Sequence, residues 1–249
     1  MRRAFSLVEL SIVLVIIGLL VGGVLSGRAL IRANELRAVP VEYGKFFVAS
    51  QAFRDRFSYI AGDIPTATNY WGAMAACPGD YTTPSTDTAT CNGDGNGAIA
   101  SRERYRFWHH LANAGMIEGR YTGVPVAVTV ALLTAGIDTP LSKIGGVQVL
   151  KLSDNGAGVM LATDPRHAII FFGAASTSAS AAVPILSPEE AWSIDTKMDD
   201  GLPGKGTMMN YNNTHTTVGS CVTSATADTA TYALTLSDKA CAPFFALNF

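Results

Sequence analysis

The chain has 249 residues, of which 48% are hydrophobic and only 15% are charged. That size and balance favour one membrane helix with one globular domain over two large soluble domains. The formal net charge at pH 7 is −2, so the chain has no overall basic field, and no specific nucleic-acid partner is expected. The sequence shows no Ser/His/Asp order, phosphate-binding loop or catalytic cysteine setting, and we therefore expect no enzyme.

The first stretch, MRRAFSLVELSIVLVIIGLLVGGVLSG, predicts a membrane helix over residues 5–27. About 20 mostly apolar residues, rising about 1.5 Å each, span the hydrocarbon core of a bilayer. Arg2 and Arg3 precede this stretch, so the positive-inside rule holds the amino terminus in the cytoplasm and exports the remainder of the chain. An ordinary secretory signal carries its small residues after the apolar core, whereas here Ala4 lies before it.

The apolar stretch contains one carboxylate, Glu9, where an ionised acid costs roughly 2 to 3 kcal/mol and usually has a cationic partner. Arg-Arg-Ala at residues 2–4, then FSLVEL and an unbroken apolar helix, resemble the class III leader of type IV pilins and type II secretion pseudopilins. In that family the prepilin peptidase cuts between the small and the aromatic residue and methylates the new amino terminus. The resemblance implies a leader of residues 1–4, cut between Ala4 and Phe5, with Glu9 paired to the Phe5 amine. The alternative is a signal anchor with a chance glutamate.

Beyond the membrane stretch, one apolar stripe at spacings of three and four residues predicts that the helix continues to residue 58. Pro40 should kink this helix, and Ser50 interrupts the stripe. Residues 5–58 would then be a spine helix packed against a head domain of residues 59–249. The stripe consists of Leu36, Val39, Tyr43, Phe46, Phe53 and Phe57.

The chain contains four cysteines, an even number in an exported region where disulfides persist. Four cysteines allow three pairings. We favour Cys77 with Cys91 and Cys221 with Cys241, since each pair closes a polar, loop-like segment. Free buried thiols are the alternative.

The segment CNGDGNGAIASRE has the spacing of an EF-hand calcium loop. In that loop alternate residues turn oxygens inward, a glycine permits the sharp turn, and a final glutamate chelates the ion with both oxygens. Only Asp94 and Glu103 bring formal charge, so we expect weak Ca²⁺ binding, in about the millimolar range of extracellular modules. The alternative is a Gly/Asn turn closed by a disulfide. The ligand positions are Asn92, Asp94, Asn96, the main-chain carbonyl of Ala98, and Glu103.

The remaining sequence of the head predicts a small antiparallel sheet and two helices. RERYRFWHHLANAG has helical spacing. Its adjacent histidines, His109 and His110, would point to different helix faces, which argues against a transition-metal site. A second helix begins at the capping box of Ser187 and Glu190. The strand candidates are VPVAVTV, VQVLKL, GVMLA, HAIIFF and YALTL, and the apolar end APFFALNF should pack on the sheet or on a neighbouring subunit.

The stretch DTKMDDGLPGKG brings a second group of acids, Asp195, Asp199 and Asp200, before a glycine and proline turn. Carboxylates at a helix end face water more often than they bind an ion. The alternative is implied by the resemblance: major pseudopilins have calcium-binding loops near the carboxyl end, so a second ion is conceivable here.

Together these features predict an α+β fold, in which a long amino-terminal helix packs on a small antiparallel sheet within a loop-rich, disulfide-tied head. The resemblance implies a structural subunit of a type IV pilus or related filament, with identical subunits, the prepilin peptidase and an assembly platform as partners. The precursor would lie in the inner membrane with its head in the periplasm, and the mature subunit in an extracellular filament. The alternatives are a type II secretion pseudopilin in a periplasmic pseudopilus, and a minor or tip pilin with an adhesive or ligand-binding head.

Overall fold

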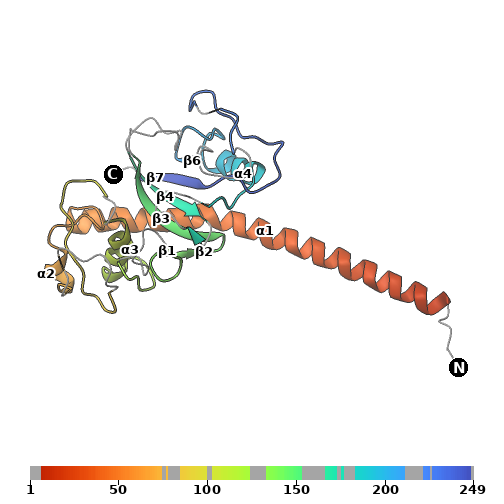
Figure 1. The fold of residues 1–249 in the computed structure, drawn as a ribbon, viewed down its shortest axis with the longest axis horizontal. Helices are drawn as coiled ribbons and strands as arrows, with labels where there is room; N and C mark the ends of the chain where they lie inside the picture. The colour runs from red at the N-terminus through yellow and green to blue at the C-terminus, as the bar shows by residue number, and fades with distance from the viewer. Residues whose placement is uncertain are drawn as a thin grey trace. The chain divides into compact units, whose positions relative to one another are not determined.

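The structure, a computed structural model, shows the α+β fold that the sequence predicts (Figure 1). The residues that it describes are 7–74, 77, 85–99, 103–123, 133–152, 166–172, 175–176, 183–210, 221–224 and 226–247. The chain divides into two compact units, Met1–Ala38 and Val39–Phe249. The helices are α1 (Leu7–Phe57), α2 (Ala67–Trp71), α3 (Glu103–Asn113) and α4 (Pro188–Met198). The strands are β1 (Leu133–Thr134), β2 (Leu141–Ser142), β3 (Gly145–Leu152), β4 (Arg166–Phe172), β5 (Ala175–Ser176), β6 (Met208–Asn210) and β7 (Pro243–Leu247).

Helix α1 is unbroken over 51 residues and contains Pro40. It includes an 18-residue window of mean hydropathy 2.7, none of which is buried. Among the described residues, α1 is the one helix long and apolar enough to cross a membrane. Glu9 lies in its first turn, where the helix dipole favours an acid. The residues of the predicted cut, Ala4 and Phe5, lie outside the described part of the chain.

The second part of α1 has a buried face that includes most of the predicted stripe. Ser50, the expected gap, is 1% exposed, and its hydroxyl donates to the carbonyl of Phe47 at 2.7 Å. A serine can lie in this face because the helix itself satisfies its donor. The helix ends at Phe57, and Ser58 adopts a φ of 60° with its N–H donating to the Arg54 carbonyl. The buried residues are Val39, Tyr43, Phe46, Ala49, Ser50 and Phe53.

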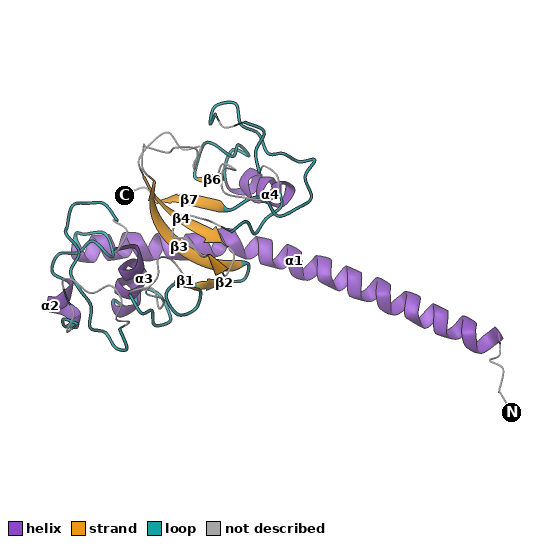
Figure 2. Cartoon of the chain, viewed as in Figure 1, coloured by secondary structure: helices purple, strands orange, loops and turns teal. Residues whose placement is uncertain are grey.

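The main sheet has the strand order β2-β3-β4-β7-β6, and all neighbouring strands are antiparallel (Figure 2). Strand β7 follows all the other strands in sequence but lies between β4 and β6. It pairs with β4 so that Phe244 is opposite Ile170 and Leu247 is opposite His167. Every residue of β7 is buried, so both faces of the sheet are covered at its centre.

The spine helix packs on one face of this sheet, as the sequence predicts. The Tyr43 hydroxyl donates to the carbonyl of Ala246 at 2.8 Å, and Phe171 meets Phe245 edge to face with ring centroids 5.4 Å apart. Burial, followed by the charge of Asp199, raises the pKa of Tyr43 to about 12. Strand residues at alternate positions point to the opposite face. They join α3 in a hydrophobic cluster of Tyr105, Ala168, Ile170, Phe172, Met209, Ala242, Phe244 and Ala246.

The carboxyl-terminal region differs from prediction. The sequence predicts a strand at residues 232–236, but Tyr232 makes only an isolated bridge to Val222, and a turn follows. The Tyr232 side chain points into the head, where its hydroxyl donates to the buried carboxylate of Asp195 at 2.6 Å. The apolar end forms β7 itself, and α2, β6 and the small β1–β5 sheet were not predicted. The strand candidates at residues 124–130 and 158–162 lie outside the described residues.

The other predicted helices are confirmed as α3 and α4. Helix α4 begins with the predicted capping box. The Ser187 hydroxyl accepts the N–H of Glu190 at 3.2 Å, and the Glu190 carboxylate accepts the N–H of Ser187 at 3.0 Å. Two of the backbone donors at the start of the helix are thereby satisfied, so its first residue is fixed by local sequence.

Two disulfides tie loops of the head. They join Cys77 to Cys91 and Cys221 to Cys241, with Cα atoms 5.5 Å and 4.9 Å apart. These are the pairings favoured on the sequence. The first bond ends next to the predicted calcium segment, and the second anchors the residues that lead into β7.

Candidate metal sites

The loop before α3 is a series of tight turns built by its alternating Asx and glycine residues. The Asp94 carboxylate accepts the N–H of Asn96 at 3.0 Å, and the Asn96 side-chain oxygen accepts the N–H of Ala98 at 2.7 Å. Gly95 and Gly97 have φ values of 72° and 79°, a region that glycine enters without steric cost. The sequence therefore folds this loop locally, with its acids held by the backbone.

Asp63, from the turn after α1, is the anchor of this loop. Its side chain is 1% exposed, and its Oδ1 accepts the N–H groups of Gly95 and Asn96 at 2.7 Å and 3.2 Å. Its Oδ2 accepts the N–H of Gly97 at 2.8 Å. A Cβ on Gly93 would lie 2.4 Å from the main-chain carbonyl carbon of Asp63, so only glycine allows this close approach.

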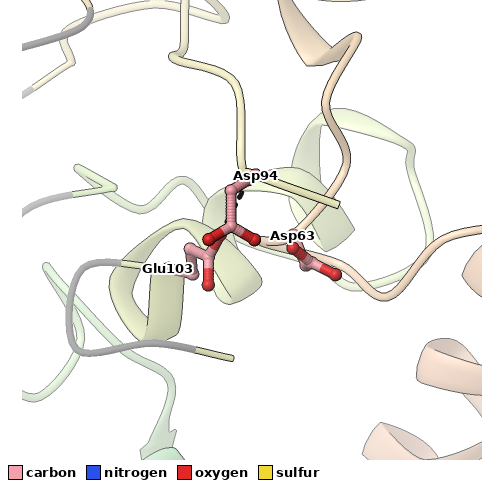
Figure 3. A group of neighbouring side chains, drawn as sticks. All are labelled: Asp63, Asp94 and Glu103. Carbon is pink, nitrogen blue, oxygen red and sulfur yellow. Dashed lines mark hydrogen bonds between the residues drawn. The ribbon is translucent and has the colours of Figure 1, made fainter. Parts of the chain in front are cut away.

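Three carboxylates meet at this place: Asp63, Asp94 and Glu103 (Figure 3). Each offers an oxygen within 4.8 Å of the others. Glu103, in the first turn of α3, is 5% exposed, and its Oε1 accepts the Asp94 N–H at 3.0 Å. Burial, followed by the charge of Glu103, raises the pKa of Asp63 to about 6, although the N–H groups of Gly97 and Gly95 oppose the shift. A cation between the three acids would remove their mutual repulsion.

The structure brings together only part of the predicted ligand set. Asp94 and Glu103 are neighbours, whereas the side-chain oxygen of Asn92 accepts the N–H of Thr68 at 2.9 Å and so binds the first turn of α2. The Asn96 side chain forms hydrogen bonds within the loop, where its Nδ2 donates to Asp94 at 2.8 Å. Ala98 contributes its N–H to the loop, as described above, and its main-chain carbonyl stays a predicted ligand.

Sequence reasoning missed Asp63 as a member of the group. It comes from a turn-rich segment far from the calcium-loop pattern, so only the tertiary fold reveals its place. The one local signal is an acid between Gly62 and Ile64 inside a loop where the chain otherwise has turn formers. Asp63 also lines a cavity of about 340 Å³ together with Arg54, Ser58, Tyr59, Ile60, Gly95 and Gly97.

The donor chemistry suits a hard cation. All three side chains offer carboxylate oxygens, which Ca²⁺ and Mg²⁺ prefer, and the group contains no histidine or cysteine of the kind that zinc prefers. Flexible coordination by several oxygens at unequal distances is characteristic of Ca²⁺. The acidic group is therefore one that could bind a metal such as Ca²⁺.

The two adjacent histidines have structural roles on α3. His110 Nδ1 accepts the N–H of Gly62 at 3.0 Å, and its Nε2 lies 2.9 Å from the Thr90 hydroxyl. Because Nδ1 accepts, the neutral ring keeps its proton on Nε2 and donates it to Thr90. Burial lowers the pKa of His110 well below its usual value and that of His109 to about 4. Both rings are therefore neutral core side chains near pH 7.

A second acidic group consists of Asp195, Asp199 and Asp200, again with one oxygen of each within 4.8 Å of the others. The sequence favours helix-end acids that face water, but Asp195 is 0% exposed. Burial, together with the charges of Asp200 and Asp199, raises its pKa to about 7, although hydrogen bonds from Tyr232 and the Gly201 backbone oppose the shift. Asp195 is therefore a buried carboxyl group in the core of the head.

Comparisons of the chain with protein-family models, with curated proteins and with solved structures found no match. The architecture itself is pilin-like: a long apolar amino-terminal helix, an antiparallel sheet against which its second part packs, and two disulfides. The apolar helix and the disulfides together suggest a membrane anchor with an extracytoplasmic head.

Proposed function

We propose that the protein is a structural subunit of a type IV pilus or pilus-like filament, with a structural rather than a catalytic role. The observation that carries the proposal is helix α1, which is exposed and apolar in its first part and buried against the sheet in its second. A helix of this kind can anchor a precursor in a bilayer. It can also exchange lipid for the helices of identical subunits when a filament forms.

In this mechanism the prepilin peptidase removes residues 1–4, and the assembly platform extracts the subunit from the inner membrane into the filament. Glu9 then meets the methylated amine of Phe5 on its own or a neighbouring chain, and each charge offsets the cost of burying the other. The pair would set the axial register of the subunits. Support comes from the place of Glu9 in the first turn of an otherwise apolar, lipid-compatible helix.

The head would be stabilised outside the cytoplasm by its covalent and ionic ties. Two disulfides close loops with sequence separations of 14 and 20 residues. Ca²⁺ at Asp63, Asp94 and Glu103 would join the turn after α1 to the start of α3. Disulfides of this kind form and persist in the oxidising compartments outside the cytoplasm.

The test is the variant Glu9→Leu, expressed in the native host and compared with Glu35→Gln. Glu35 pairs with Arg32 at 3.0 Å within the same helix, a partly exposed ion pair of the kind worth about 0 to 1 kcal/mol. We expect Glu9→Leu to stay in the membrane without forming filaments, and Glu35→Gln to assemble. Electron microscopy and peptide mass analysis of sheared surface material report the filament and its first residue.

Filaments of normal abundance from Glu9→Leu, or surface protein that still begins at Met1, would overturn this function. The same measurement separates the three filament roles. A major subunit dominates the sheared material, a tip pilin is scarce in it, and a pseudopilin stays with the cell.

A further inference from the structure

We propose that a cavity beside α3, with the ring of His109 in its wall, binds one neutral sugar unit, such as the end of a glycan chain. The described residues that line it come from residues 85–87, α3, residues 120–122 and residues 136–137. None of them lines the cavity at Asp63. The proposal goes beyond the structural role and does not rest on it, because every lining residue belongs to the head.

The size of the cavity suits a small ligand. Its volume is about 320 Å³, at the lower end of the range of about 300 to 1,000 Å³ that is typical of small-molecule pockets. The lining combines polar side chains with a few apolar groups, as such pockets do. The cavity therefore fits a single polar ring rather than a long chain.

The ring of His109 is the observation that points to a ligand. It is 2% exposed, and neither of its nitrogens makes a hydrogen bond, whereas the neighbouring His110 is bound through both of its nitrogens. Burial lowers the pKa of His109 to about 4, and the main-chain carbonyl of Asp87 opposes the shift. A carbonyl only accepts, so it could take at most the ring proton, and the other nitrogen would still lack a donor. Buried polar atoms without partners are costly.

A hydroxyl group is the partner that this ring requires. Because His109 is neutral near pH 7, one of its nitrogens donates and the other accepts. A hydroxyl both donates and accepts, so it can meet either nitrogen, whereas a carboxylate can meet only the donor and an ammonium only the acceptor. The histidine therefore favours a ligand with several hydroxyl groups.

The charges at the cavity favour a neutral ligand. The described lining contains one acid, Asp87, and one base, Arg120. The Asp87 carboxylate accepts the N–H of Ala89 at 2.8 Å, and Arg120 Nη2 donates to the Thr86 carbonyl at 2.8 Å. The two opposite charges balance, so an ionic ligand would meet its own charge in the same lining. A neutral polyhydroxyl ligand meets no such repulsion.

Two apolar surfaces complete the match to a sugar, which has C–H faces as well as hydroxyl groups. Ile137 is 48% exposed where it lines the cavity. The ring of Tyr121 is half-buried in the lining, and its hydroxyl donates to the Glu118 carbonyl at 3.0 Å. An aromatic ring held in this way offers a rigid apolar face with its polar end already satisfied.

The lining segments are fixed to one another before a ligand enters. The N–H of Ser85 donates to the Thr122 carbonyl at 2.9 Å, and the N–H of Thr122 donates to the Ile137 carbonyl at 3.2 Å. From α3, Asn113 Nδ2 donates to the Thr88 carbonyl at 2.8 Å. The segment that carries Ser85 and Thr88 also lies between the two cysteines of the first disulfide. A cavity preformed in this way lowers the entropic cost of binding.

Saturation-transfer difference NMR on the full-length protein tests the proposal. The protein is held in micelles of a detergent without a sugar headgroup, so that the detergent does not compete. The probes are the methyl glycosides of glucose, galactose, mannose and N-acetylglucosamine, with methyl glucuronide as the charged comparison. We expect saturation transfer to at least one neutral glycoside, and weaker transfer to the glucuronide.

Two variants then assign this binding to the cavity. His109→Phe should weaken it about tenfold or more, because the new ring can neither donate nor accept a hydrogen bond. Ile137→Ser, at an exposed position, should weaken it about three- to tenfold through the loss of apolar surface. Leu141→Ser is the matched control, since Leu141 is 66% exposed and lies outside the lining. Circular dichroism checks that each variant folds.

The proposal is overturned if no neutral glycoside receives saturation from the folded wild type, or if only the glucuronide does. It is also overturned if His109→Phe and Ile137→Ser both bind as the wild type does, or if His109→Phe does not fold and Ile137→Ser binds as the wild type does. Because these measurements use the unassembled chain, none of the results bears on whether the protein forms filaments.

Discussion

The ring of Tyr43 in α1 stacks on the ring of Phe245 in β7, with centroids 4.9 Å apart and planes inclined by 24°. This contact joins the spine helix to the strand at the centre of the sheet. The hydroxyl of the same tyrosine donates to β7 as well. The spine helix is thus part of the core of the head, and changes on either side of this contact should destabilise the head.

Phe245→Ala should lower the free energy of unfolding of the head by about 3 to 5 kcal/mol, because it removes a fully buried ring and leaves a cavity. Tyr43→Phe should cost about 1 to 3 kcal/mol, since the carbonyl of Ala246 loses its donor. Urea unfolding of the detergent-solubilised protein, followed by tryptophan fluorescence, measures both. Val48→Ala, at a 65% exposed position of the same helix, is the control and should change stability by less than about 0.5 kcal/mol.

Asp63→Asn should weaken Ca²⁺ binding at the loop before α3 by about tenfold or more, because one of three carboxylates is lost. Asn92→Ala should leave that affinity nearly unchanged, since its side-chain oxygen binds Thr68 instead. Isothermal titration calorimetry of the wild type and of the two variants measures the affinity of this loop for Ca²⁺. Equal affinity losses in the two variants would favour the EF-hand ligand set over the group seen in the structure.

The buried ring of His109 should make the head less stable in acid. Its pKa is about 4 in the fold, against 6.5 in the unfolded chain, so below pH 6.5 the unfolded state binds more protons. Stability is then lost as the pH falls from 6.5 to about 4, by up to about 1.4 kcal/mol per pH unit, or about 3 kcal/mol in total.

The variant His109→Phe isolates this effect, because the titrations of the carboxyl groups cancel when the two proteins are compared. We expect the difference between the two denaturation midpoints to be the same at pH 7 as at pH 8. The wild type should lose stability relative to the variant between pH 6.5 and pH 4. Parallel pH profiles for the two proteins would show that the ring is protonated equally in both states.

Local patterns were enough to predict α1, α3 and α4, but not the short α2. The apolar stretch predicts α1, and the capping box of Ser187 and Glu190 predicts the first turn of α4, because all the interacting groups lie within a few residues. Strands β3 and β4 were predicted for the same reason, from their runs of Val, Ile and Phe.

Features that depend on distant residues were not predictable. The place of β7 between β4 and β6 is a matter of pairing, which no local pattern encodes. Tyr232 matched an alternating strand pattern, yet its hydroxyl binds an acid 37 residues earlier in the chain. Asp195 was expected to face water because its hydrogen-bond partner Tyr232 lies 37 residues away in the sequence, beyond any local pattern. Asp63 likewise joins its group only through the fold.

The position of β7 has a consequence for biogenesis. The sheet lacks an interior strand until the ribosome has translated residue 247, so β4 and β6 have no partner between them on the nascent chain. The core of the head therefore cannot be completed before this last strand has been synthesised. A stop codon shortly before Pro243 would therefore remove the middle of the sheet rather than a dispensable tail.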